Sequence, residues 1–94
     1  MTQTGLPQFD GLPISVVERE TGIPKDLLRM WERRYGFPEP ARDAQGDRVY
    51  PREQVDKLRA VRRLMDQGFR PGKIIHLSAE ELSRLFEARR QRTG

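Results

Sequence analysis

The chain has 94 residues, of which 35% are hydrophobic and 34% are charged, and its net charge at neutral pH is +4. This length suits one small domain with a modest core. The absence of cysteine excludes disulfides and the common zinc frameworks, and no apolar stretch approaches the roughly 20 residues of a membrane span.

Two short helices are predicted near the start of the chain. The segment SVVERETG predicts a helix of about two turns, with Ser15 and Glu18 as a capping box and Gly22 as its C-terminal stop. Pro24 suits the first turn of a second helix, which we expect over about residues 25–35. Two helices joined this tightly form a helix-turn-helix unit.

A small hairpin is predicted next. Residues 36–40, GFPEP, end the second helix, and the glycine at position 46 lies between two short segments, the second of which, RVY, has β propensity. Such a pattern indicates a two-stranded hairpin, or wing, over residues 41–50. An isolated hairpin is only marginally stable, so we expect it to pack on helices.

Three further helices are predicted in the rest of the chain. The third helix runs from Pro51 or Arg52 to Gln67, and apolar residues follow one of its faces: Val55, Leu58, Val61, Leu64 and Met65. The segment RPGKIIHL indicates a turn and a short fourth helix. The segment SAEELSRLFEARRQ opens with a capping box of Ser78 and Glu81 and predicts the last helix.

The helix over residues 25–35 has two contrasting faces. Its apolar residues share one arc of the helical wheel: Leu27, Leu28, Trp31 and Tyr35. We therefore interpret Trp31 as a core anchor rather than a base-stacking residue. The predicted core consists of Val17, Leu28, Trp31, Tyr35, Leu58 and Leu64.

Basic residues occupy the opposite face of this helix. Lys25, Arg29 and Arg33 recur at i, i+4 and i+8, while Met30 and Arg34 border the two arcs. A row of basic side chains on the second helix of a helix-turn-helix suits the major groove of DNA. The alternative is a solvated basic surface.

A wing arginine provides a second candidate contact. Arg48 on the predicted hairpin can reach a minor groove or a flanking phosphate. The alternative is a surface ion pair with Asp43 or Asp47.

Two stretches of the chain resemble a known family. LRMWERRYGFP and RVYPREQVDKLRAVRRLMDQG are similar to the DNA-binding domain of MerR-type transcriptional regulators, within the branch that contains CarH, CarA and LitR. The resemblance covers residues 12–77. It implies a mainly α, winged helix-turn-helix fold with a two-stranded β-hairpin wing. It also implies a bacterial, cytoplasmic and nucleoid-associated regulator, such as a repressor, that binds double-stranded DNA at promoter or operator repeats.

The resemblance also implies a set of DNA contacts. Met30 and Trp31 stand where many relatives have tyrosines that touch the DNA backbone, and Tyr50 matches the wing tyrosine. The full expected DNA-binding set is Lys25, Asp26, Arg29, Met30, Arg33, Arg34, Arg48 and Tyr50. The sequence departs from the family at Pro24, where many relatives have a Ser or Thr cap. It also departs at Asp47, whose charge would repel phosphate.

The resemblance extends to domain organisation. We expect a flexible leader over residues 1–11 and a C-terminal helix or linker over residues 78–94, leading to a separate effector domain that in this branch often binds cobalamin. No cofactor or metal is expected in this chain, because His76 does not match the axial-histidine motif of that domain. We expect no membrane association, an oligomeric full-length regulator and a monomeric fragment.

The sequence leaves two alternatives to sequence-specific DNA binding. The same basic face could bind an acidic protein partner such as an antirepressor, or the domain could bend DNA as an excisionase-like architectural protein. An enzyme is not expected, because the chain has one histidine and no cysteine and lacks a glycine-rich phosphate loop.

Overall fold

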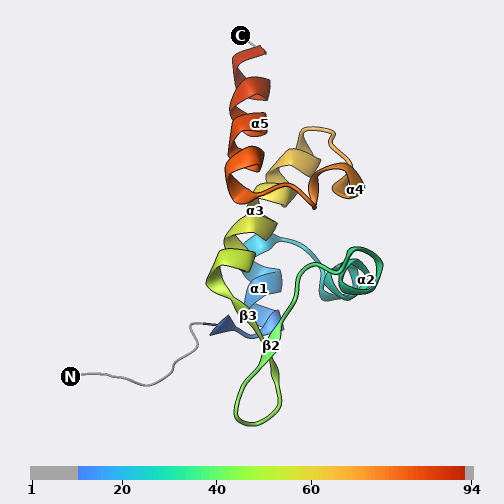
Figure 1. Cartoon of the computed structure of the whole chain (residues 1–94), viewed down its shortest axis with the longest axis vertical. Helices are drawn as coiled ribbons and strands as arrows, with labels where there is room; N and C mark the ends of the chain where they lie inside the picture. Colours follow the sequence, from blue (N-terminus) through green and yellow to red (C-terminus); the bar gives the residue numbers. More distant parts are fainter. Residues whose placement is uncertain (1–10, 93–94) are drawn as a thin grey trace, which may run out of the picture.

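The computed structural model describes residues 11–92, and the expected leader lies outside the described residues except for Gly11. The predicted mainly α fold with a wing is confirmed (Figure 1). In chain order the elements are β1 (Gly11–Leu12), α1 (Ile14–Thr21), α2 (Lys25–Tyr35), β2 (Ala41–Arg42), β3 (Arg48–Pro51), α3 (Arg52–Asp66), α4 (Pro71–Ile74) and α5 (Ala79–Arg92). The wing lies at one end of the molecule and α5 at the other, with α3 between them.

The predicted capping box of α1 is wrong. Helix α1 begins at Ile14, and Pro13 occupies its N-cap without a side-chain hydrogen bond, so Ser15 lies inside the helix. Glu18 instead accepts a hydrogen bond from the backbone N–H of Lys25, at 3.0 Å. The reason is that Pro24 at the N-cap of α2 has no side-chain acceptor, and Glu18 satisfies one of the free N–H groups there.

The turn between α1 and α2 is fixed from inside. Gly22 adopts the left-handed conformation, with φ of 76°, and ends α1 as predicted. The buried Thr21 hydroxyl donates to the Val17 carbonyl at 2.7 Å and accepts from the Ile23 N–H at 3.1 Å. These bonds set the direction in which α2 leaves α1.

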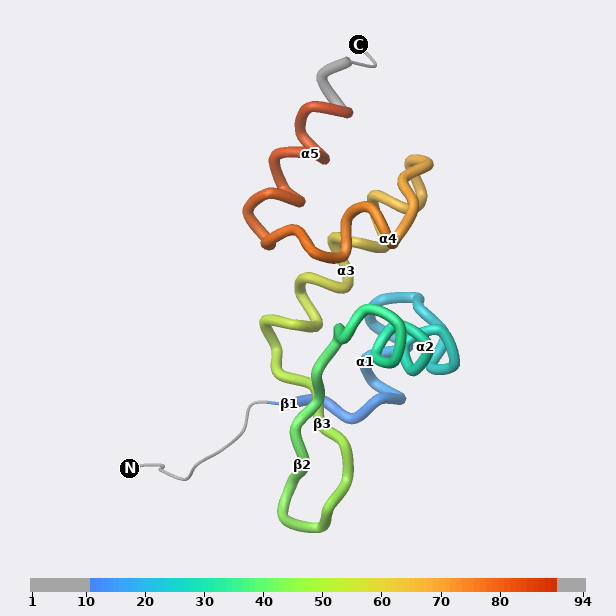
Figure 2. The backbone as a smooth tube through the Cα atoms, turned by 45° about the vertical axis from the view of Figure 1, so that its right-hand side comes forward, coloured from blue at the N-terminus to red at the C-terminus, as the bar shows by residue number. Residues whose placement is uncertain are grey.

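The sheet has one strand more than the predicted hairpin. Its order is β1-β3-β2, and both pairings are antiparallel. Strand β1 approaches β3 so closely that a Cβ on Gly11 would lie 2.9 Å from the Cβ of Val49. Two residues are too few to produce a strand pattern in a sequence, so only the fold shows this pairing. Figure 2 shows the wing extending away from the helices.

The core lies between α3 and the helix-turn-helix. Trp31 of α2 and the apolar residues of α3 are fully buried, apart from the partly buried Ala60 and Met65. Tyr35 is half-buried at the edge of this core. The fully buried core residues are Val17, Ile23, Leu28, Trp31, Tyr50, Val55, Leu58, Val61, Leu64 and Leu82, with Ile74 and Ile75 almost as buried.

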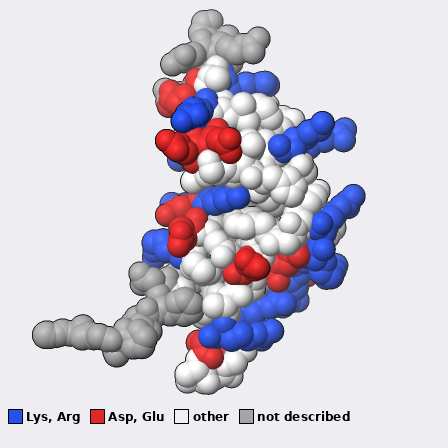
Figure 3. Space-filling view, in the orientation of Figure 1, with Lys and Arg blue, Asp and Glu red and all other residues white. Residues whose placement is uncertain are grey.

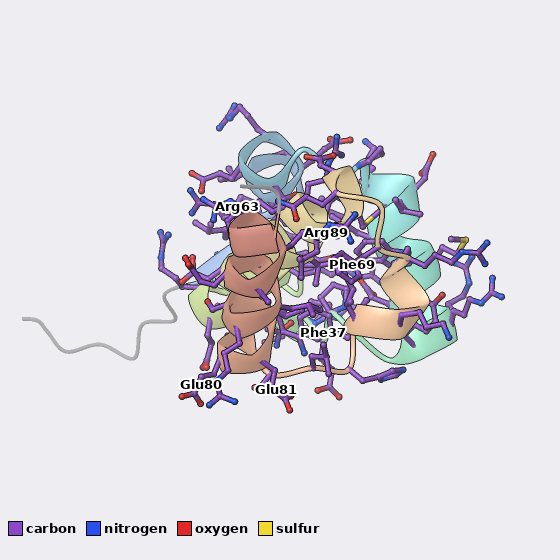
Figure 4. The ribbon with its side chains drawn as sticks, turned by 90° about the horizontal axis from the view of Figure 1, so that it is seen from above. Phe37, Arg63, Phe69, Glu80, Glu81 and Arg89 are labelled. Carbon is purple, nitrogen blue, oxygen red and sulfur yellow. The ribbon has the colours of Figure 1, made fainter. Side chains whose placement is uncertain are left out.

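Helix α5 begins at the predicted capping box. The Ser78 N–H donates to Glu81 at 2.9 Å, and the Glu81 N–H donates to the Ser78 hydroxyl at 3.1 Å. Arg89 then lies 5.4 Å from the ring centre of Phe69 and donates to the Gln67 carbonyl at 3.0 Å (Figure 4). Together these contacts dock α5 on the end of α3.

Candidate nucleic-acid interface

Helix α2 presents a basic face to solvent. Trp31 and Leu28 face the core, so the helical period turns Lys25, Arg29 and Arg33 outward, and all three are exposed. Among residues 11–92, no acidic side chain lies within ion-pair distance of these three bases. The face is therefore free to meet an anion.

The wing completes a groove beside this face. The groove between α2 and the wing is lined by four arginines and one carboxylate: Arg29, Arg33, Arg42, Arg48 and Glu32. Residues 29 and 33 come from the helix, whereas Arg42 and Arg48 are cross-strand partners in β2 and β3. Facing cross-strand residues point to the same side of a hairpin. The fold thus adds two wing arginines to two helix arginines.

Arg42 was absent from the predicted set. It is exposed, and its guanidinium donates to the Gly46 carbonyl at 2.9 Å, within the wing. The hairpin register would have revealed it, because Arg42 pairs with Arg48. That register depends on the length of the turn, which the sequence did not fix.

Glu32 sits between the helix and the wing. Its carboxylate accepts a hydrogen bond from the Tyr50 hydroxyl at 2.8 Å and lies 3.5 Å from the Arg48 guanidinium. The side chain of Glu32 is 14% exposed and that of Arg48 is 36% exposed. Arg48 therefore pairs with neither Asp43 nor Asp47, the alternative partners that the sequence suggests. Asp43 accepts the N–H groups of Gln45 and Asp47, both at 2.9 Å, and so closes the wing turn.

Tyr50 is a core residue rather than a surface residue. It is fully buried, so its placement corrects the expectation that it contacts DNA directly. Burial, followed by the hydrogen bond to Glu32 and the charge of its carboxylate, raises the pKa of Tyr50 to about 12, against a smaller lowering by Arg48. The hydroxyl stays protonated at neutral pH and keeps donating to Glu32.

The remaining expected residues are spread along α2. Lys25 and Asp26 lie exposed in its first turn, and Met30 is exposed between the basic row and the core. Arg34 lies on the other side, 5.9 Å from the ring centre of Tyr35. Of the eight expected residues, the groove brings together Arg29, Arg33 and Arg48.

A second basic hollow adjoins the C-terminal end of α2. It is lined by Tyr35, Arg70, Pro71, Gly72 and Lys73, so that α4 and its N-cap residue Arg70 add two exposed basic side chains. A Cβ on Gly72 would lie 3.0 Å from the Tyr35 hydroxyl oxygen, so this approach favours a glycine. The two basic residues are visible in the sequence segment RPGK, but only the fold places them beside the basic face of α2.

Basic side chains are concentrated on one edge of the molecule. In Figure 3, Lys and Arg side chains predominate along the edge formed by α4, α2 and the wing, whereas over α3 and α5 they are mixed with Asp and Glu. One continuous basic edge of this kind is the electrostatic footprint of a polyanion site. No helix among residues 11–92 is long and apolar enough to cross a membrane, and these residues hold no group of three potential metal ligands.

Comparisons with known proteins agree with this geometry. A family model described as MerR HTH family regulatory protein matches residues 12–81. Similar proteins include the HTH-type transcriptional repressor CarA of Myxococcus xanthus, 49% identical over 57 residues, which are 60% of this chain and 20% of CarA. The repressor CarH of the same organism is 38% identical over 55 residues, 58% of this chain and 18% of CarH.

A third similar protein is also a regulator. The mercuric resistance operon regulatory protein of Bacillus cereus is 38% identical over 48 residues, 51% of this chain and 36% of that protein. All three similar proteins are regulators rather than enzymes. The matched part spans about a fifth of the length of CarA and CarH.

Proposed function

Because this chain belongs to the MerR helix-turn-helix family of regulatory proteins, whose members regulate transcription by binding double-stranded DNA, we propose that it binds an operator sequence. In this proposal α2 lies in the major groove, and the wing follows the flanking backbone. The single observation that carries the proposal is the groove in which Arg29 and Arg33 of α2 meet Arg42 and Arg48 of the wing.

The helix supplies the sequence-reading part of this interface. An α-helix fits the major groove, and an arginine can donate two hydrogen bonds to the edge of a guanine. Arg29 and Arg33 are exposed and have no acidic partner among the described residues, so neither has to leave an ion pair to reach a base. Lys25 and Asp26 lie one turn earlier on the same helix and extend the reading surface.

The wing and α4 supply phosphate contacts that position the helix. Arg42 and Arg48 face the same groove from one side, and Arg70 and Lys73 flank α2 from the other. Contacts to phosphates fix orientation without reading sequence. With one basic residue of α2 added to these four, about five phosphate contacts predict that log K falls against log salt with a slope near −4 to −5.

The test uses duplexes selected from a random pool by binding to this chain. Arg29→Ala and Arg33→Ala should each weaken binding to the selected sequence by about 1–3 kcal/mol and reduce its preference over a scrambled duplex. Arg84→Ala is the matched control, because Arg84 lies on α5 in an exposed pair with Glu80. Equal affinities for selected and scrambled DNA in the wild type would refute sequence-specific binding.

A carboxylate in the groove favours a second candidate function. Arg48 already lies beside the carboxylate of Glu32, so the same arginines have the chemistry to hold acidic side chains of a protein partner. We propose this face as the docking site of such a partner in competition with DNA. Simultaneous binding of DNA and an acidic protein, each with unchanged affinity, would rule out a shared surface.

We propose that the full-length regulator is oligomeric and that this chain by itself binds as a monomer, more weakly. The described residues do not fit the cobalamin that the resemblance implies for a separate domain, because their histidine, His76, is exposed and meets only the edge of Tyr35, with 6.1 Å between ring centres.

A further inference from the structure

We propose that Glu32 is a specificity-determining residue, whose fixed carboxylate holds Arg48 and so limits sequence-independent binding to the DNA backbone. This inference rests on the proposed DNA-binding function. It assigns a role to the one acidic side chain that lines the arginine groove, where an acid opposes the binding of phosphate.

The side chain of Glu32 is held in the groove. Its side chain is only 14% exposed, and one oxygen accepts the Tyr50 hydroxyl at 2.8 Å. Tyr50 is itself fully buried in the core. The Glu32 carboxylate is thus a fixed negative charge on α2, held by the hydrogen bond from Tyr50 of β3.

Arg48 can exchange the Glu32 carboxylate for a DNA phosphate. Its guanidinium lies 3.5 Å from the other Glu32 oxygen, and its side chain is 36% exposed. A half-exposed ion pair at this distance contributes little to stability. A DNA phosphate that enters the groove can therefore take Arg48 from Glu32 at small cost, provided that the duplex is seated deeply enough to reach it.

Binding to DNA without sequence recognition comes almost entirely from Lys and Arg side chains that neutralise phosphates. While Glu32 holds Arg48, one of the four groove arginines is withheld from loosely placed DNA. The remaining three keep their charge, and the negative field of Glu32 reduces the attraction of each. Loose complexes are weakened most, because they do not displace Glu32 from Arg48.

The test measures binding to a mixed-sequence duplex that carries no selected site. Glu32→Gln keeps an oxygen acceptor for the Tyr50 hydroxyl and removes only the charge. We expect this variant to bind the duplex about five- to tenfold more tightly at about 0.1 M salt, with a salt slope steeper by about one. A merely structural role for Glu32 would weaken binding instead.

Two controls make the result specific. Glu80→Gln removes the same charge from α5, at the end of the molecule away from the wing (Figure 1), and should leave affinity and slope unchanged. In an Arg48→Gln background, Glu32→Gln should lose most of its effect, because its partner is gone.

The outcomes separate this inference from the proposed function. Unchanged or weaker binding by Glu32→Gln, with wild-type protein that does bind DNA, overturns the role of Glu32 alone. A gain that persists in full without Arg48 also overturns it, because the charge would then act without holding that arginine. If the wild-type protein binds no duplex, or binds with an affinity that does not change with salt, both the role of Glu32 and DNA binding itself are overturned.

Discussion

Replacing Tyr50 with phenylalanine isolates the bond that joins the wing to the recognition helix. Tyr50→Phe keeps the buried ring and removes only the hydroxyl that donates to Glu32 at 2.8 Å. A hydrogen bond to a charged group contributes about 1.5–3 kcal/mol. We expect the free energy of unfolding at neutral pH to fall by about that amount, towards its lower end, because Arg48 still accompanies Glu32.

The dependence on pH makes this prediction sharper. The pKa of Tyr50 is 10.0 in the unfolded chain and about 12 in the folded protein. The stabilisation is fully present below pH 10, because the hydroxyl is then protonated in both states. It is lost as pH rises through 12, since the unfolded state ionises first. The total loss is about 2–3 kcal/mol, at about 1.36 kcal/mol per pKa unit, and about half of it has occurred by pH 11.

The assay is denaturant unfolding of both proteins at pH 7 and pH 11. The difference in unfolding free energy between wild type and Tyr50→Phe should shrink by about 1.4 kcal/mol between these values, because only the wild type loses this contribution. Tyr35→Phe is the control, since the Tyr35 hydroxyl makes no hydrogen bond with any described residue. We expect this variant to change the free energy of unfolding by less than about 0.5 kcal/mol. A pH-independent difference would refute the assignment of the raised pKa to Tyr50.

Two further predictions test contacts that only the fold revealed. Arg42→Ala should make the salt slope of DNA binding shallower by about 0.9 without altering the unfolding free energy by more than about 0.5 kcal/mol; an unchanged slope in a fluorescence anisotropy titration would show that Arg42 meets no phosphate. Glu18→Ala should lower the unfolding free energy by about 1 kcal/mol through loss of the cap on Lys25, while Ser15→Ala should have little effect. Denaturant unfolding that ranked these two variants in the opposite order would contradict the observed caps.

The two capping-box motifs of this chain behave differently in the fold. The motif Ser15–Glu18 fits a capping box by spacing, yet Glu18 bonds to Lys25, seven residues along the chain. The neighbouring prolines decide this, since Pro13 and Pro24 occupy the N-caps of α1 and α2 and provide no side-chain acceptor. The matching motif before α5 forms as predicted, because Ser78 stands at the N-cap itself. Spacing alone cannot distinguish these two cases.

Tyr50 shows a similar limit at the interface. Its match to the family's wing tyrosine suggested a surface contact. Residues two apart in a strand share a face, so Arg48 and Tyr50 both reach Glu32 from β3, but the Tyr50 side chain packs within the core cluster. Tyr50 therefore enters the core and reaches Glu32 from within.

The sequence by itself determined the parts of this protein that depend on short-range order. Helical periodicity placed Trp31 inward and Arg29 outward, and glycines and prolines set the helix ends within a residue or so. The tertiary structure decided which charges meet. The pairing of Arg42 with Arg48 depends on hairpin register, and the bond from Tyr50 to Glu32 joins residues 18 positions apart. Such contacts arise only when the helix and the wing pack on one core, and no local pattern encodes them.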